Sequence, residues 1–251
     1  MYSHYTNIDS VFNMLQSEKV WFNSLAFMND EMEGYDLHSV LSDVLQIKYG
    51  SDECKSKLAL VDTTIGTHLR FQFSFSASTL SDDISQWRAY TKLGQGICVE
   101  FEEGFIEGEN INKVECLYSK EDKRKSIIRD RNLKANDATM NQILDTQEGI
   151  EGFVSSIIDS LVRFKNKSFI PENEVRWVKR FDGLSQAKGK VQYRPHRLGL
   201  TMYHEVPINL KNVKKIILGP QIPKQNLKTF EDFLITIGCP ALVVKSEVTL
   251  R

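Results

Sequence analysis

The sequence lacks most of the short motifs that identify an enzyme class. Its four cysteines form no CxxC pair, and none lies beside a histidine at metal-ligand spacing. This pattern argues against a zinc site and a disulfide framework, and it predicts reduced, mostly buried thiols in the cytoplasm. The sequence also has no GxxxxGK[ST], no GxGxxG after a strand, no HExxH and no GxSxG. Kinase, Rossmann, zincin and α/β-hydrolase folds are therefore disfavoured.

Long apolar runs and a bias of charge are absent as well. The longest apolar stretch, residues 233–244, is interrupted by Gly238 and Pro240, and residues 1–10 do not resemble a signal peptide. We therefore expect a soluble cytoplasmic protein with no membrane partner. The 32 Lys and Arg residues balance 33 Asp and Glu residues. A protein that binds nucleic acid through bulk charge is usually far more basic, although a local basic patch remains open.

The hydrophobic share of 41% is sufficient for a core. Apolar periodicity predicts one α+β domain over residues 1–251, with a mixed, split or two-sheet β core. A charged region near 120–167 is expected to be a helical insertion of two helices, with a turn near 136–137. Helices are also predicted from residue 8 and over 36–49, 52–65, 82–93 and 224–237. Strands are predicted near 2–6, 20–22, 69–76, 97–101, 113–118, 174–181, 190–194, 199–206, 214–218 and 241–246.

Two strands carry polar side chains that could bind a ligand. Period-2 alternation places His4 and Thr6 on one face of the first strand. In the strand near 69–76 the same alternation directs Ser74 and Ser76 to one face and Phe75 to the core. Each pair has an ordinary structural explanation: a hydrogen-bonded histidine near a terminus, or a half-exposed strand with polar residues outward. Neither pair identifies a function by itself.

Two further groups carry carboxylates and aromatic rings. If a strand begins at Glu172, then Glu172, Glu174 and Arg176 share one face. Two carboxylates so close would raise the pKa of one of them unless Arg176 offsets the repulsion. Trp87 and Tyr90 lie three residues apart on a predicted helix, where they could line a pocket for a flat ring. The alternatives are a solvated strand face and ordinary core packing.

Taken together and in order, these pieces resemble the bacterial DUF2971 family, some of whose members are linked to phage defence by abortive infection. The resemblance covers most of the chain. It includes the residues discussed above and two additional segments, SLAFMND at 24–30 and GICVEF at 96–101.

The family pattern is in turn similar to ADP-ribosyltransferases, which implies an ADP-ribosyltransferase-like split β core with NAD as substrate. His4 matches the Arg or His of the first strand in those enzymes, and it would bind the adenosine ribose. Ser74 and Ser76 match a Ser-x-Ser that supports the nicotinamide ribose. The resemblance implies NAD contacts for His4, Thr6, Ser74, Ser76, Trp87, Tyr90 and Arg176, with Trp87 or Tyr90 stacking on the nicotinamide ring.

Glu172 and Glu174 match the catalytic Glu-x-Glu. Glu174 would be the catalytic carboxylate and Glu172 would orient the acceptor, because the reaction passes through an oxocarbenium-like transition state that a negative charge stabilises. Glu174→Gln is then expected to abolish NAD-dependent activity and leave the fold intact. No metal is required. The resemblance implies an ADP-ribosyltransferase or NAD glycohydrolase that acts as a toxin or phage-defence effector.

Several alternatives remain open from the sequence. The acceptor could be a protein, a nucleic acid, a small molecule or water, and an antitoxin or a phage protein is a candidate partner. A metal-dependent nuclease would use Glu172 and Glu174, but Arg176 stands where such sites usually have Lys, and Arg cannot act as a base. A non-catalytic sensor of a nucleotide or of a phage protein is the third alternative.

Overall fold

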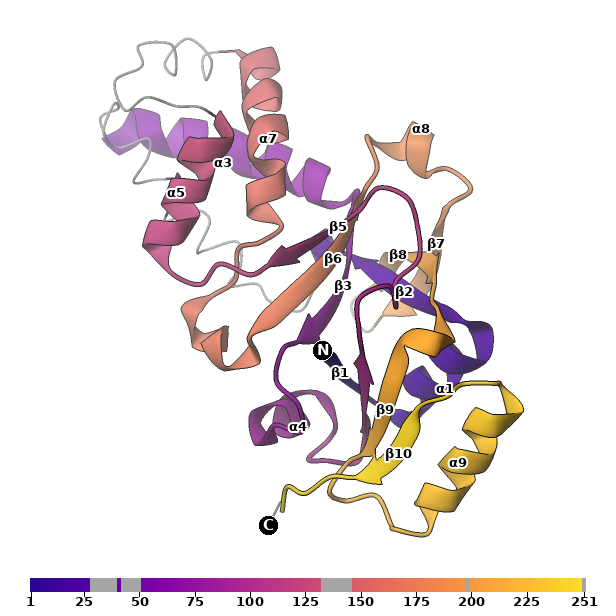
Figure 1. The fold of residues 1–251 in the computed structure, drawn as a ribbon. Coiled ribbons are helices and arrows are strands. Elements are labelled where there is room, and N and C mark those ends of the chain that lie inside the picture. Colours follow the sequence, from indigo (N-terminus) through magenta and orange to yellow (C-terminus); the bar gives the residue numbers. More distant parts are fainter. Residues whose placement is uncertain (28–39, 42–50, 132–145, 197–198, 250–251) are drawn as a thin grey trace.

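The structure is a computed structural model that describes residues 1–27, 40–41, 51–131, 146–196 and 199–249. Their strands form one ten-stranded sheet (Figure 1). The sheet is mixed, since β9 and β10 pair in parallel while β4 pairs with β9 in the antiparallel direction. The predicted α+β class and mixed sheet are thus confirmed.

The strands and helices follow the expected order with small shifts at their ends. The strands are β1 (Tyr2–Thr6), β2 (Lys19–Ser24), β3 (Gln72–Ser78), β4 (Ile97–Phe101), β5 (Ile111–Glu115), β6 (Glu174–Arg180), β7 (Val191–His196), β8 (Gly199–Pro207), β9 (Val213–Leu218) and β10 (Leu242–Lys245). The α-helices are α1 (Ile8–Ser17), α3 (Ser51–Leu69), α4 (Ile84–Tyr90), α5 (Lys120–Arg131), α7 (Gln147–Leu161), α8 (Leu184–Ala187) and α9 (Asn226–Thr236). Short 3-10 helices are η1 (Leu25–Phe27), η2 (Lys167–Glu172) and η3 (Leu210–Asn212).

Side-chain caps fix two of the helix starts. The Asn7 side chain caps α1 by accepting a hydrogen bond from the backbone N–H of Ser10 at 2.8 Å. Asp83 caps α4 by accepting from the backbone N–H groups of Ser85 and Gln86. The helix predicted over 82–93 therefore begins later, at Ile84, because its capping residue has extended backbone angles.

The sheet forks at β3. One edge of β3 pairs with β6 along its whole length. The other edge is shared, since β1 pairs with β3 at Ser3 and Ser78, whereas β2 pairs at Asn23 with Ser74 and at Ser24 with Phe73. Strands β1 and β2 therefore diverge from one edge of β3, and α1 connects them. This fork divides the sheet into two parts and leaves space between them for a core.

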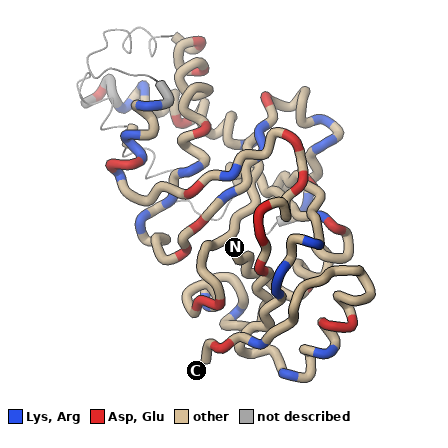
Figure 2. Tube along the Cα trace, in the orientation of Figure 1, with Lys and Arg blue, Asp and Glu red and all other residues tan. Residues whose placement is uncertain are grey.

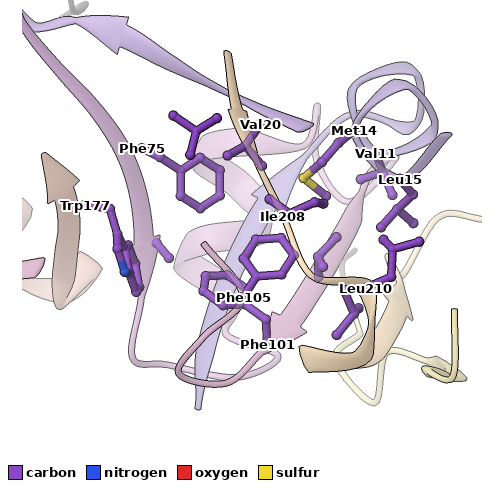
Figure 3. Close-up of a cluster of buried hydrophobic side chains, with 14 of the residues drawn as sticks. Val11, Met14, Leu15, Val20, Phe75, Phe101, Phe105, Trp177, Ile208 and Leu210 are labelled. Atoms are coloured by element: carbon purple, nitrogen blue, oxygen red, sulfur yellow. The ribbon is translucent and has the colours of Figure 1, made fainter. Parts of the chain in front are cut away.

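The main hydrophobic core fills the space beside this fork (Figure 3). Phe75 lies at its centre, with ring centroids 6.1 Å from Phe101, 6.4 Å from Phe105 and 6.3 Å from Trp177. Helix α1 contributes residues at helical spacing from the other side. These buried aliphatic side chains are Val11, Met14 and Leu15.

A second core holds three helices together at one end of the sheet (Figure 1). Helices α3, α5 and α7 bury residues that include Val61, Ile127 and Phe153. The predicted insertion near 120–167 thus contains α5 and α7, and α3 packs with them although it lies far away in the sequence. The turn predicted near 136–137 and most of the helix predicted over 36–49 lie outside the described residues. Acidic and basic residues are mixed along the sheet and along the group of helices α3, α5 and α7 (Figure 2).

Candidate functional site

One face of the sheet carries serines beside charged residues. Across the β3–β6 pair, Ser78 is the partner of Glu174 and Ser76 is the partner of Arg176. Directly paired residues project to the same side of a sheet, so these side chains share one face. The opposite face of the same strands carries Phe75 in the main core. The alternation predicted for the β3 strand is thereby confirmed.

Glu174 lies at the centre of a buried ion cluster. Its Oε1 accepts from Arg176 Nε at 2.8 Å, and its Oε2 accepts from Lys165 Nζ at 2.5 Å. Burial alone would raise the pKa of Glu174, but the Arg176 guanidinium and the Lys165 ammonium overcome this effect and hold the pKa at about 2. Glu174 is therefore ionised at neutral pH.

Glu172 joins the same cluster from outside the strand. It ends η2, and Asn173 in the left-handed conformation (φ 44°) separates it from β6. A strand that begins at Glu172 is therefore excluded, because the chain turns at Asn173, whereas the strand predicted over 174–181 is confirmed as β6. Glu172 nevertheless approaches Glu174, since Lys165 Nζ lies 2.6 Å from its Oε2. Tyr90 donates to its Oε1 at 2.5 Å from α4.

Lys165 is a central residue of the cluster that the sequence analysis missed. It bridges both carboxylates, and they raise its pKa above the usual value although burial acts in the opposite direction. Lysines near it are abundant in the charged region of the sequence, so no local pattern distinguishes it. Tyr118 also supports the cluster, because its hydroxyl accepts from the backbone N–H of Glu174 at 2.7 Å. Burial raises the pKa of Tyr118 to about 12.

The two aromatic residues of α4 have different environments. Tyr90 is 46% exposed, and burial of its hydroxyl end together with the hydrogen bond to Glu172 raises its pKa above the usual value. Trp87 is completely buried, packs edge-on against Tyr5 at 4.9 Å and donates from Nε1 to Asp82 at 2.7 Å. The expectation that Trp87 stacks on a ligand is corrected by this burial. Of these two residues, Tyr90 is the one that presents a ring at the acidic cluster.

The structure does not bring His4 and Thr6 to this face. The His4 ring lies 4.5 Å from the ring of Phe75, which belongs to the main core on the other side of the sheet. His4 Nδ1 lies 2.8 Å from the backbone carbonyl oxygen of Ser76, in the fork between β1 and β3. Burial lowers the pKa of His4, so the ring is neutral at pH 7. Thr6 shares the side of His4 by alternation along β1.

Ser74 and Ser76 do lie on the face of Glu174 and Arg176, at different depths. Ser74 is buried on β3 opposite Val178. Ser76 is half-buried opposite Arg176, and its Oγ has no hydrogen-bond partner among the described residues. The serine nearest to the acidic cluster is Ser78, which the sequence analysis did not select. Its hydroxyl donates to the backbone carbonyl of Glu172 at 2.6 Å.

Comparison with known proteins gives one match. Residues 86–177 match the family described as "Protein of unknown function (DUF2971)". No curated protein and no solved structure matches the chain. The match supports the family resemblance over this segment, which is less than half of the chain.

The DUF2971 segment contains the whole acidic cluster. It begins within α4, includes Tyr90 and extends through Lys165 and Glu172 to Glu174 and Arg176. The serine strand β3 and the first strand β1 lie outside it. The segment that matches the family therefore supplies the charged residues, while β3 supplies the surface on which they lie.

The described residues also bear on metal binding and on membrane insertion. No group of three or more His, Cys, Asp or Glu residues that could hold a metal occurs in the part of the chain that the structure describes. At Glu172 and Glu174, Lys165 and Arg176 already occupy carboxylate oxygens that a metal would need. None of the described helices has both the length and the hydropathy to span a bilayer.

Acid should destabilise the protein through Glu174. Its pKa of about 2 lies below the ordinary glutamate value of 4.5, which applies to the unfolded chain. Ionisation of Glu174 then contributes about 3 kcal/mol of stability above pH 4.5, and this contribution is lost as the pH falls toward 2. Urea denaturation between pH 5 and pH 3 should show the decrease. Carboxyl-carbon NMR should show Glu174 still ionised at pH 3; a midpoint near 4.5 would contradict the cluster geometry.

Proposed function

We propose that the protein cleaves the nicotinamide–ribose bond of NAD, as an ADP-ribosyltransferase-like enzyme or an NAD glycohydrolase. The observation that carries the proposal is the pair Glu172 and Glu174 beside the half-exposed ring of Tyr90. A fixed negative charge next to an aromatic ring suits a reaction in which positive charge develops on a ribose while a flat ring departs. The family resemblance provides the second line of support.

In this proposal the two carboxylates have different roles. The Glu174 side chain is 5% exposed and both of its oxygens bind cations, so it acts as the anchor for Lys165 and Arg176. The Glu172 side chain is 12% exposed and accepts from Lys165 and Tyr90. A carboxylate accepts about four hydrogen bonds, which leaves Glu172 with capacity for a ribose hydroxyl. Glu172 is thus the carboxylate that would contact NAD.

The proposed reaction needs no further cofactor. The bond between C1′ and the nicotinamide nitrogen breaks, and its electron pair remains on that nitrogen. The resulting oxocarbenium carbon bonds to an oxygen of water or of an acceptor, which releases its proton to Glu172 or to solvent. Lys165 holds Glu172 in place through the 2.6 Å contact. The Tyr90 ring would stack on the departing nicotinamide.

The test is release of nicotinamide from labelled NAD. Wild type should release it, and Glu172→Gln should reduce the rate by about 10²–10³, because the uncharged amide no longer opposes the developing positive charge. Glu121→Gln, on the exposed face of α5, is the matched control and should keep full activity. Circular dichroism should show both variants folded. Absence of release by wild type, or equal release by wild type and Glu172→Gln, would refute the proposal.

We further propose that this activity makes the protein a toxin or a phage-defence effector, as the family resemblance suggests. Expression of wild type in bacteria should then lower cellular NAD and slow growth. Glu172→Gln should relieve both effects at equal protein levels. Growth inhibition without a fall in NAD would favour the sensor or nuclease alternative over NAD cleavage.

A further inference from the structure

Two polar side-chain atoms close to the acidic cluster are buried without a partner. They are Nε2 of Gln86 on α4 and Oγ of Ser76 on β3, and neither has a hydrogen-bond partner among the described residues. Gln86 as a whole is only 3% exposed. A buried polar atom without a partner costs free energy, and most such atoms in native proteins are satisfied. The pair therefore requires an explanation.

The register of β1 and β3 places one of these atoms on the face of the sheet that α4 covers. Ser3 is the antiparallel partner of Ser78, so Tyr5, two residues after Ser3, lies on the same face of the sheet as Ser76, two residues before Ser78. Trp87 of α4 packs edge-on against the Tyr5 ring at 4.9 Å. Helix α4 therefore packs on the face of the sheet that carries Tyr5 and Ser76.

Helix geometry places the other atom on the side of α4 that faces the acidic cluster. Gln86 and Tyr90 are four residues apart, so they lie on the same side of the helix. Tyr90 reaches Glu172, which fixes the direction of that side. Gln86 is thus on the side of α4 that faces Glu172, and Ser76 is on the face of the sheet that α4 covers, so both unpartnered atoms border the region beside the half-exposed Tyr90 ring.

We propose that Gln86 and Ser76 bind the carboxamide group of nicotinamide. A primary carboxamide carries one acceptor and two donors, which match an N–H donor and a hydroxyl oxygen at once. Its carbonyl oxygen accepts from Gln86 Nε2, and its NH₂ group donates to Ser76 Oγ. The attached ring lies against Tyr90. The choice of nicotinamide rests on the proposed function; the requirement for a group with a donor and an acceptor rests on the two unpartnered atoms.

The test is equilibrium binding of free nicotinamide, measured by calorimetry and ligand-observed NMR. Gln86→Met keeps the side-chain length and removes the amide, and it should weaken binding by about tenfold. Its melting temperature should equal or exceed that of wild type, because an unsatisfied buried donor is removed. A residue that merely holds the structure together would instead lower the melting temperature.

Gln72→Met is the matched control. Gln72 is also buried on β3 with an unpartnered side-chain atom, Oε1, but it lies four residues from Ser76, about 13 Å along the strand. Its substitution should leave nicotinamide binding unchanged. No binding by wild type at millimolar nicotinamide, or equal binding by wild type and Gln86→Met, would overturn the carboxamide site.

The same proteins separate this inference from the proposed function. If wild type binds nicotinamide but releases none from NAD, the carboxamide site stands and NAD cleavage fails. If wild type cleaves NAD and Gln86→Met binds nicotinamide as tightly as wild type does, NAD cleavage stands and the carboxamide site fails.

Discussion

Replacing Glu174 with glutamine should destabilise the protein by about 3–5 kcal/mol, because it removes the negative charge that balances the buried Arg176 and Lys165 side chains. The Arg176 side chain is 1% exposed, and Glu174 is the carboxylate that its Nε contacts. Lys165 would keep its ion pair with Glu172, so most of the lost interaction energy is that of Arg176. In a domain of this size the change corresponds to a melting temperature lower by about 10 °C. Urea denaturation at pH 7 measures it directly.

An exposed ion pair provides the control for this prediction. Glu103 contacts Lys113 at 2.7 Å, but its side chain is 69% exposed. Glu103→Gln should therefore change the free energy of unfolding by less than about 1 kcal/mol. Equal effects of Glu174→Gln and Glu103→Gln would show that the buried cluster does not stabilise the fold as its geometry indicates.

This prediction corrects the expectation that Glu174→Gln leaves the fold intact. Loss of activity in that variant cannot be assigned to chemistry, because the fold loses stability as well. Glu172→Gln is the cleaner test of activity, since Lys165 retains Glu174 and only the outer carboxylate changes. A double-mutant cycle with Glu174→Gln and Lys165→Met would measure the coupling within the pair.

Adding a methyl group at Gly219 should have a second large effect. A Cβ at this position would lie 2.6 Å from the backbone oxygen of Gly96 and would also overlap the backbone oxygen of Gly94. Backbone atoms cannot move aside as a flexible side chain can. Gly219 N–H donates to the Gly96 oxygen at 2.9 Å, so the clash would also break the junction between β9 and the segment that leads from α4 into β4. Gly219→Ala should cost about 3 kcal/mol.

Gly152→Ala is the opposite case and serves as the control. Gly152 lies in α7, and nothing lies within 4 Å of an added Cβ. Alanine restricts the unfolded chain more than glycine does and fits a helix, so this variant should be more stable by about 1 kcal/mol. Urea denaturation of the two variants should give changes of opposite sign. A Gly219→Ala protein as stable as wild type would refute the close backbone approach.

The local pattern of the chain determined much of the secondary structure. Alternating Phe and Ser residues fixed β3, because a strand has period 2 and one of its faces is buried. Asn7 fixed the start of α1, because its side chain satisfies an N–H group of the first turn. The start of β6 at Glu174 followed from the same kind of local signal. These features depend on neighbours in the sequence, so a single sequence reveals them.

The family resemblance also brought Glu172, Glu174, Arg176 and Tyr90 into one hypothesis, and the structure places them together. Only the tertiary structure decided that Lys165 joins both carboxylates, that Trp87 is core and that His4 lies on the other face of the sheet. The reason is physical. Periodicity tells which residues of one strand share a side, but which sides of β1, β3 and β6 meet depends on strand pairing and on the fork at β3. Those contacts join residues distant in the chain, and no local pattern encodes them.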